Sequence, residues 1–137
     1  MPGGSILIDH YRHPQCRGEV ESPTRRNESH NRKCGDRITL TSRPDDHGML
    51  EIRFDGQGCM YCLASASILC STLSGMNPEE ARSRIALFRK WLRDSLTEEG
   101  GLTDEMRALG EVKAFPMRID CADLAWKCAD RMLQHDE

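Results

Sequence analysis

The chain has 137 residues, enough for one domain with a modest hydrophobic core. Hydrophobic residues make up 38% and charged residues 30%, so we expect a thin core, such as one sheet covered by helices. The formal net charge of −3 argues against nucleic acid as the main partner, and no apolar run reaches the roughly 18 residues that a membrane span requires.

The first predicted elements are a helix and a hairpin. Residues 5–13 favour a short helix, which Pro14 ends. Residues 16–33 are polar and lack a sustained period, so we expect mostly loop there, with a partly mobile segment over residues 1–33 and room for a short edge strand. Residues 36–42 and 49–55 alternate apolar and polar side chains around "RPDDHG", which favours a turn. This pattern predicts an antiparallel hairpin.

Two helices are predicted after the hairpin. The first covers residues 59–75, in which the apolar residues recur at helical spacing: Leu63, Ala66, Cys70 and Leu73. The second covers residues 77–92, with Asn77 as its N-cap. Its expected core face consists of Ile85, Phe88 and Leu92.

The last third of the chain is predicted to be helical in two places. A loop over residues 97–101 leads to a short helix that Thr103 caps and Gly110 ends. Residues 112–120 are expected to be extended around Pro116. A closing amphipathic helix follows over residues 121–133, with Leu124, Cys128 and Met132 on one side. The order of elements predicts a single α+β domain over residues 1–137, with an antiparallel sheet covered on one face.

Seven cysteines are an unusual number for a chain that we expect in the cytoplasm: Cys16, Cys34, Cys59, Cys62, Cys70, Cys121 and Cys128. The beginning of the chain has only three consecutive apolar residues, too few for the apolar region of a signal peptide. An odd count of cysteines in a reducing compartment argues against a disulfide framework and favours metal binding or thiol chemistry. Free cysteines also pack as small hydrophobic residues, as expected for Cys70 and Cys128 within helical periods.

Three cysteines stand at the edges of predicted elements. Cys34 precedes a strand, while Cys59 and Cys121 each open a helix, where the N-terminal partial charge favours thiolate. Cys34 and Asp36 point to the same side of an extended chain, and Gly35 between them allows a bend. Three thiolates and a carboxylate suit tetrahedral Zn²⁺ or iron–sulfur chemistry. Nothing local in the sequence forces Cys121 to join the others.

Four stretches resemble, in order and spacing, the U-type iron–sulfur assembly proteins, the family of IscU, SufU and the N-terminal part of NifU: "DHYRHPQCRGEV", "KCGDRITL", "FDGQGCMYCLASASIL" and "FPMRIDCADLAW". The resemblance extends from Asp9 to about Met132. It implies a three-stranded sheet, with a strand within residues 19–29. It also implies that four residues form the metal or cluster site: Cys34, Asp36, Cys59 and Cys121.

The sequence also shows similarity to one branch of this family and differences from the family pattern. Residues 95–116 resemble the insertion that marks the Suf branch. Asp120 stands where the Isc branch has histidine and the Suf branch commonly lysine, which leaves the tuning of the Cys121 thiolate in question. Arg118 matches a Suf-branch arginine and is expected to pair with Asp36 or to stabilise an incoming persulfide, unless it is a solvated surface residue.

Cys62 replaces the serine usual in the family and creates the motif C-M-Y-C at a helix start. We interpret it as a neutral replacement facing the interior or the rim of the site. The alternative is an extra ligand or a resolving thiol close to Cys59. The five histidines are expected to be solvated or packed, although His10 could reach the site, and the two tryptophans, Trp91 and Trp126, are expected in the core or at helix contacts.

The resemblance implies a role in iron–sulfur cluster biogenesis, with a cysteine desulfurase and downstream assembly or apo-acceptor proteins as partners. In one version Cys34 accepts persulfide sulfur, so that the chain acts as a zinc-dependent sulfurtransferase. In the other, the same four ligands scaffold iron or a nascent [2Fe–2S] cluster. Two alternatives lack sulfur transfer: a zinc-stabilised interaction module, and a redox protein that uses Cys59 and Cys62 as a dithiol.

Overall fold

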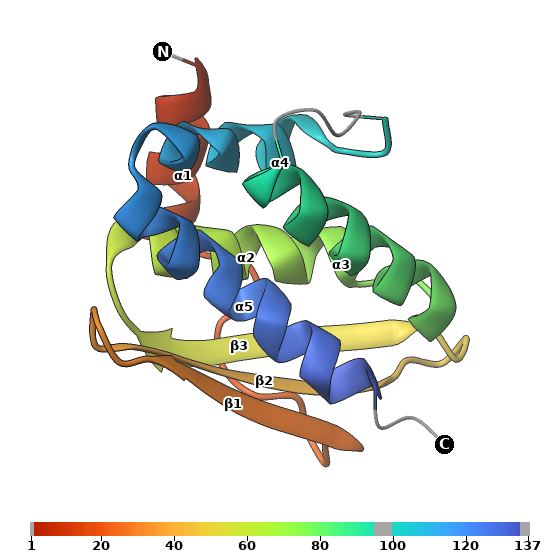
Figure 1. Cartoon of the computed structure of the whole chain (residues 1–137). Helices are drawn as coiled ribbons and strands as arrows, with labels where there is room; N and C mark the ends of the chain where they lie inside the picture. Colours follow the sequence, from red (N-terminus) through yellow and green to blue (C-terminus); the bar gives the residue numbers. More distant parts are fainter. Residues whose placement is uncertain (1, 95–99, 135–137) are drawn as a thin grey trace.

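Three antiparallel strands form one sheet, and the helices cover one of its faces (Figure 1). The structure is a computed structural model that describes residues 2–94 and 100–134. The strands lie in the order β1 (Arg25–Asn31), β2 (Asp36–Pro44) and β3 (Leu50–Gln57), and β2 pairs with both neighbours. The expected α+β fold with a three-stranded antiparallel sheet is therefore confirmed.

Within the described ranges, six helical elements accompany the sheet: α1 (Pro2–Arg12), α2 (Met60–Leu73), α3 (Pro78–Arg93), α4 (Asp104–Ala108), the 3₁₀ helix η1 (Leu109–Ala114) and α5 (Pro116–Gln134). Helix α2 contacts α1, α5, η1 and β3, and its residues 64–70 are all buried. Helix α5 packs over β1 and β2 and against α3 (Figure 1). The core therefore lies between the sheet and the helical layer.

Local signals explain where two of the helices begin. The side chain of Asn77 accepts a hydrogen bond from the backbone N–H of Glu80 at 2.8 Å. The hydroxyl of Thr103 accepts one from the backbone N–H of Met106 at 3.1 Å. Both predicted caps are thus confirmed, because each side chain satisfies an N–H that has no partner within the helix.

The predicted hairpin and core are also confirmed. Strands β2 and β3 each end slightly later than predicted, and α1 begins earlier than predicted. The side chains expected in the core are buried, including both tryptophans: Ile85, Phe88, Trp91, Leu92, Leu124, Trp126, Cys128 and Met132.

Residues 16–33 contain more regular structure than we predicted. Strand β1 occupies residues 25–31 and overlaps the strand that the resemblance implies within residues 19–29, whereas the expectation of loop is wrong there. The sequence of β1 shows no apolar alternation, and of its residues only Ser29 is buried. Its backbone pairing with β2 therefore holds it at the edge of the sheet. Upstream, Arg17 forms an isolated parallel bridge with Phe54 of β3. The mobility of residues 1–33 stays a prediction.

The prediction of an extended segment over residues 112–120 is wrong. Helix α5 begins at Pro116, whose fixed φ suits the first helical turn, and only Phe115 separates it from η1. Gly110 does not end the preceding helix, since it lies within η1. Cys121 consequently lies in the second turn of α5 and not at its start.

Among the described residues, no helix combines the length and the apolar character needed to span a bilayer. Of the loop predicted over residues 97–101, residues 97–99 lie outside the described part of the chain, and residues 100–101 form a turn.

Candidate metal centre

The turn between β1 and β2 positions Cys34 and Asp36. Asn31 pairs with Asp36 across the two strands, so residues 32–35 form the turn. Gly35 has a φ of +71°, in the left-handed region that glycine adopts most readily. The chain therefore reverses directly before Asp36, which agrees with the bend expected at Gly35.

The other two predicted cysteines reach the same end of the sheet by separate paths. Arg37 pairs with Gln57, so the end of β3 lies beside the start of β2. Cys59 follows as the N-cap of α2. Helix α5 carries Cys121 over the sheet. At the left of Figure 1, the β1–β2 turn, the β3–α2 connection and the beginning of α5 lie along one side of the molecule.

Cys34, Asp36 and Cys121 come together closely. Their ligand atoms all lie within 4.8 Å of one another, a spacing compatible with one metal ion. Cys59 lies outside this compact group, but its backbone N–H donates a hydrogen bond to Oδ1 of Asp36 at 3.1 Å. The structure thus brings Cys121 to the C-G-D segment, which spacing alone did not establish, and places Cys59 at the edge of the group.

The carboxylate of Asp36 fits a cation. Asp36 is only 1% exposed, and its Oδ2 atom is buried with no hydrogen-bond partner among the described residues. A buried carboxylate oxygen without a partner is costly, and a bound cation would compensate it. With two thiols beside it, this donor set suits Zn²⁺ or iron.

The two thiols of the compact group differ in access to solvent. Cys34 is exposed, whereas Cys121 is fully buried. Burial raises the pKa of the Cys121 thiol well above its usual range, and the neighbouring Asp36 and Cys34 add to the increase. We expected a helix N-terminus to lower this pKa. That expectation is wrong, because Cys121 lies in the second turn of α5, among other groups that carry negative charge.

Arg118 lies beside the thiols. The pKa of its exposed guanidinium is raised, first by the neighbouring Cys121 and then by the charge of Cys59. Oδ1 of Asp36 accepts a hydrogen bond from the Cys59 N–H, and Oδ2 has no partner in the described part of the chain, so the structure does not show the expected pairing of Arg118 with Asp36. Arg118 therefore places a positive charge near Cys121, whereas the neighbouring Asp120 is acidic.

Cys62 is fully buried in the first turn of α2. Burial, followed by the negative charges of Asp36 and Cys59, raises the pKa of its thiol well above the usual range. Cys62 therefore faces the interior, one of the two placements that we expected, and the neutrality of its replacement of serine stays a prediction. Its position behind Asp36 also keeps it close to the centre.

Sequence reasoning missed Asn31, whose side-chain amide donates a hydrogen bond to the Cys121 sulfur at 3.8 Å. An asparagine in a polar stretch carries no signal of this kind by itself. The strand pairing of Asn31 with Asp36 is what identifies its position.

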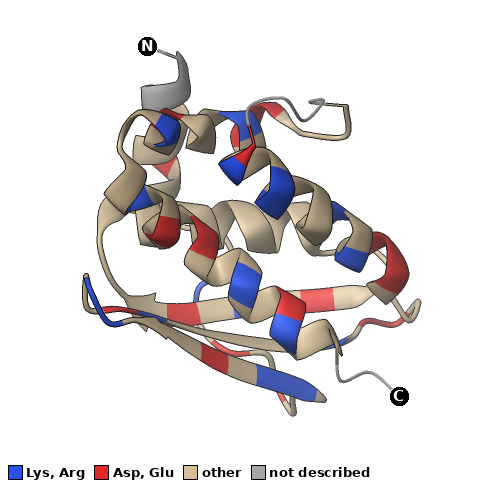
Figure 2. Cartoon of the chain, in the orientation of Figure 1, with Lys and Arg blue, Asp and Glu red and all other residues tan. Residues whose placement is uncertain are grey.

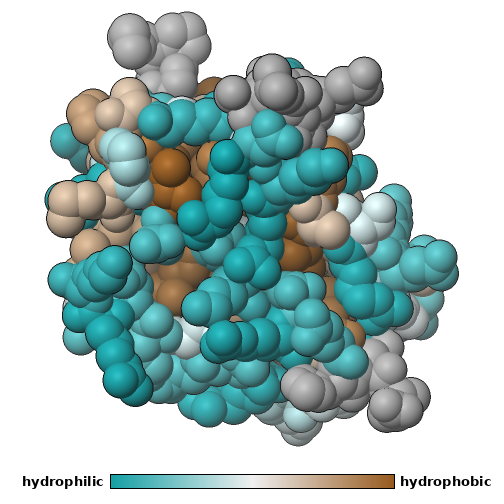
Figure 3. Space-filling view, in the orientation of Figure 1, coloured by the Kyte–Doolittle hydropathy of each residue, from teal (hydrophilic) through white to brown (hydrophobic). Residues whose placement is uncertain are grey.

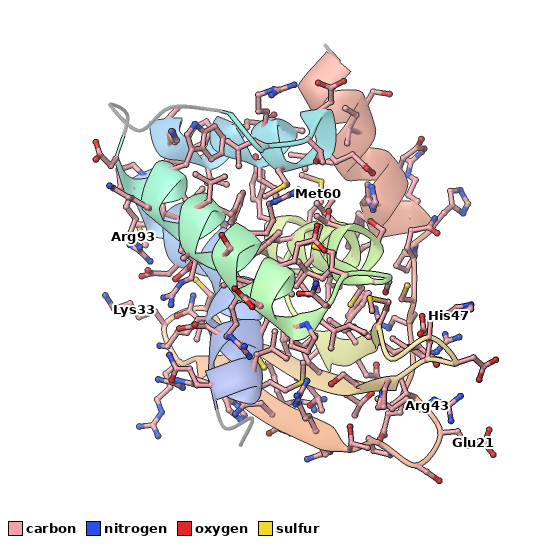
Figure 4. The ribbon with its side chains drawn as sticks, turned by 90° about the vertical axis from the view of Figure 1, so that its right-hand side faces the viewer. Glu21, Lys33, Arg43, His47, Met60 and Arg93 are labelled. Carbon is pink, nitrogen blue, oxygen red and sulfur yellow. The ribbon has the colours of Figure 1, made fainter. Side chains whose placement is uncertain are left out.

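A cavity of about 470 Å³ lies beside the centre, between the β1–β2 turn, α3 and α5. Its lining combines the acidic Asp120 and Asp123 with five basic residues and a histidine: Arg32, Lys33, Arg89, Arg93, Lys127 and His30. Figure 4 shows Lys33 and Arg93 extending from the same side of the molecule. Figure 2 shows both acidic and basic residues along α5.

Asp120 takes part in the ion pairs that line this cavity. Arg93 donates a hydrogen bond to Asp120 at 3.0 Å and another to the buried Asp123 at 3.1 Å. Arg89 binds both oxygens of Asp123, at 2.8 and 3.0 Å. The carboxylate of Asp120 is therefore engaged by α3, which offsets its negative charge next to Cys121.

An apolar groove of about 510 Å³ lies on another side of the centre, lined by Tyr61, residues 114–117 and Arg118. Phe115 is 53% and Met117 78% exposed. Figure 3 shows apolar surface gathered in the upper left of the molecule, over the same end as η1 and the start of α5. A smaller cavity, of about 230 Å³, connects Met117 to Cys34.

The remaining predicted residues do not join the centre. His10 is buried, and its ring nitrogens form hydrogen bonds with Ser67 at 2.7 Å and with Glu105. It therefore has a packing role and does not reach the thiols. Cys70 and Cys128 are buried in the core, as predicted. All seven cysteines are free thiols.

Comparison with known proteins links the chain to one family and to two kinds of relative. Residues 5–134 match the family described as NifU-like N terminal domain. The zinc-dependent sulfurtransferase SufU of Bacillus subtilis is 31% identical over 132 residues, which cover 96% of this chain and 89% of that protein. The iron–sulfur cluster assembly scaffold protein IscU of Thermotoga maritima is also 31% identical, over 98% of this chain and 94% of the relative.

Solved structures show the same fold. The crystal structure of FiSufU from Fervidobacterium islandicum AW-1 superposes with a TM-score of 0.85 at 25% identity, covering 93% of each chain. The N-terminal part of a NifU-like protein from Brucella abortus has a TM-score of 0.82 at 16% identity, covering 94% of this chain and 90% of the other. The latter likeness concerns the fold alone.

Proposed function

Since the chain belongs to the NifU-like N-terminal domain family, that of the iron–sulfur assembly proteins IscU and SufU, we propose that it serves iron–sulfur cluster assembly as a sulfur acceptor. Cys34 is the accepting thiol. The proposed ligands of a zinc ion are Cys34, Asp36, Cys59 and Cys121.

One observation carries this proposal: within a group that spans 4.8 Å, one thiol is exposed and the other two groups are buried. Cys34 lies on a turn, where it is accessible to another protein. Asp36 and Cys121 are 1% and 0% exposed, so they stay in place while Cys34 reacts. A Zn²⁺ ion bound by these residues would keep the thiols deprotonated at neutral pH.

The proposed reaction is a thiol exchange. The Cys34 thiolate uses a sulfur electron pair to form a bond with the outer sulfur of a persulfide on the donor protein. The sulfur–sulfur bond of the donor breaks, and its electron pair leaves with the donor cysteine as a thiolate. Cys34 then carries the persulfide. No electron acceptor is needed, because one sulfur–sulfur bond replaces another.

Arg118 is placed to assist this exchange. Its guanidinium lies beside Cys121 and Cys59, and the charge of Cys34 also raises its pKa. A fixed positive charge there would attract the anionic persulfide and stabilise the new one on Cys34. The sulfur donor is a cysteine desulfurase in this proposal, and the acceptors are later cluster-assembly proteins or apo-proteins. A reducing compartment such as the cytoplasm would keep the thiols available.

A second candidate function is that of a scaffold, with iron or a [2Fe–2S] cluster as cargo. The carboxylate of Asp36 favours it, because a hard oxygen ligand among sulfurs exchanges more readily than a fourth thiolate. The relative from Thermotoga maritima, named as a scaffold, supports the same function.

The test mixes the purified chain with its cognate cysteine desulfurase, free cysteine and a reductant, and measures sulfide release. We expect the wild type to increase the rate and Cys34→Ser to abolish the increase, while Cys70→Ser, a buried thiol outside the centre, keeps it. The absence of any increase with the wild type would remove the acceptor function.

Metal content and visible spectrum of the isolated protein separate the remaining candidates. A colourless protein with one zinc ion agrees with the acceptor, and a brown one with the scaffold. A colourless zinc protein without sulfur acceptance would be an interaction module. A metal-free protein with a disulfide between Cys59 and Cys62 would be a dithiol redox protein.

A further inference from the structure

Cys62 stands at a position from which its side chain points back to the start of α2. Cys59 is the N-cap of this helix, and Cys62 is its third residue. A side chain at that position can reach back to the N-cap, as glutamate does in a capping box. Cys59 makes no side-chain cap hydrogen bond, so its thiol is not used to cap the helix.

Gly58 shows how close the Cys62 sulfur lies to the centre. A Cβ atom on Gly58 would lie 2.5 Å from Oδ1 of Asp36 and 3.0 Å from Sγ of Cys62. No side chain fits at this position without a shift of these groups. The carboxylate and the thiol therefore border the same small space, on the interior side of the centre.

Two groups on this interior side lack a hydrogen bond. Oδ2 of Asp36 is buried without a partner among the described residues. The Cys62 thiol is 0% exposed and is not among the hydrogen-bonded groups of the described chain, whereas the buried Cys128 thiol donates to the carbonyl of Asn27 at 3.2 Å. A buried carboxylate oxygen and a buried thiol, both unengaged, are donors suited to a thiophilic cation.

On the other side of the centre, the Cys34 thiol is exposed to solvent. In the proposed function, Cys34 binds sulfur and leaves the metal. Its departure would leave Asp36, Cys59 and Cys121, one ligand fewer than the four typical of zinc. From these observations we propose that Cys62 is a reserve metal ligand, which binds from the interior side and restores the fourth ligand when Cys34 leaves.

This inference rests on the proposed function, because that function is what makes Cys34 leave. The Cys34 sulfur would leave the ion, and the Cys62 sulfur would bind it. The proton of the Cys62 thiol passes to water. The number of thiolate ligands stays at three, so the metal remains bound while Cys34 carries sulfur.

Cobalt(II) binding tests the proposal without any sulfur transfer. The near-ultraviolet thiolate-to-cobalt absorption increases with each thiolate ligand, so it counts the cysteines on the ion. The proteins are the wild type, Cys34→Ala, Cys34→Ala/Cys62→Ala and the matched control Cys34→Ala/Cys70→Ala, which removes another buried thiol of α2. Each is titrated in a thiol-free buffer with a phosphine reductant, and circular dichroism checks folding.

We expect Cys34→Ala to keep the absorption of the wild type, because Cys62 replaces the lost ligand. The Cys34→Ala/Cys62→Ala variant should lose about one third of it, and the Cys70 control none, since three thiolates become two in the first case only. If Cys62→Ala impairs folding, Cys62→Ser preserves the size of the side chain and provides the same comparison.

The proposal is overturned if Cys34→Ala already loses about one third of the absorption, or all of it, and the removal of Cys62 changes nothing further. That result would leave the proposed function intact, because the wild type would still bind cobalt and accept sulfur. A wild type that binds no cobalt would contradict both the centre and the reserve ligand.

Discussion

The backbone N–H of Cys59 donates a hydrogen bond to Oδ1 of Asp36 at 3.1 Å, while Oδ2 of the same carboxylate is buried without a partner in the described part of the chain. One oxygen thus fixes the start of α2 against the start of β2. The other is left for a ligand, and the thiols of Cys34 and Cys121 lie within 4.8 Å of the carboxylate. This division of the two oxygens is the structural basis of the proposed centre.

Asp36→Asn tests that division, because the amide keeps an oxygen for the Cys59 N–H and removes the charge. We expect zinc affinity to fall at least about tenfold, or about 1.4 kcal/mol. The metal-free variant should be at least as stable as the metal-free wild type, since a buried uncompensated charge is gone. Thermal unfolding with and without zinc, together with chelator competition, measures both. A less stable metal-free variant with unchanged zinc affinity would contradict this role of Asp36.

Alkylation of the metal-free protein should distinguish the thiols by burial. We expect iodoacetamide to modify the exposed Cys34 first and to leave Cys62, Cys70 and Cys128 largely unmodified at pH 8, because burial raises their pKa values and blocks access. Zinc should then protect Cys34. Peptide mass spectrometry after short exposures gives the order of reaction. Equal rates for Cys34 and Cys128 would disagree with the structure.

Alkaline pH should destabilise the fold through Cys128. Burial raises the pKa of this thiol to about 11, above its value in the unfolded chain, so the folded chain holds the proton more tightly. Its contribution is fully present below the unfolded pKa and is lost as the pH rises from about 9 to about 11. We expect a loss on the order of 2 kcal/mol in the free energy of unfolding relative to Cys128→Ala. Urea denaturation of both proteins across this range measures it, and parallel curves would refute it.

Arg118→Ala should slow sulfur transfer without changing zinc content. Its guanidinium lies beside Cys121 and Cys59 but is not a metal ligand, so we expect roughly a tenfold slower transfer, and partial recovery in Arg118→Lys. Arg131→Ala, an exposed arginine of the same helix, is the matched control. Persulfide formation on Cys34, followed by mass spectrometry, provides the rate. Equal rates for the Arg118 and Arg131 variants would show that Arg118 is only a solvated surface residue.

Those parts of the fold that depend on local chemistry could be predicted from the sequence. Asn77 and Thr103 cap their helices through side chains a few residues away, and the alternation on either side of "RPDDHG" specifies the hairpin. Strand β1 could not be predicted in this way, because its polar side chains show no period and its partner is the backbone of β2. The helix start at Pro116 could not be predicted either, since proline suits both an extended segment and a first helical turn.

The centre could be predicted only in part, for a similar reason. The spacing of Cys34, Gly35 and Asp36 is local, so the sequence was enough to place them together. The approach of Cys121 depends on how α5 crosses the sheet, and the contact with Asn31 depends on strand register. Neither contact can be predicted from a single stretch of sequence. The resemblance to a family identified Cys121 as a site residue, and the structure identified Asn31.

X-ray absorption at the zinc edge tests the central claim most directly, namely that three thiols and the Asp36 carboxylate meet at one ion. On wild-type protein loaded with one zinc per chain, the account predicts three sulfur neighbours at about 2.3 Å and one oxygen at about 2.0 Å. Asp36→Asn should change the oxygen shell alone. A shell of four sulfurs, or of two, in the wild type would contradict the account.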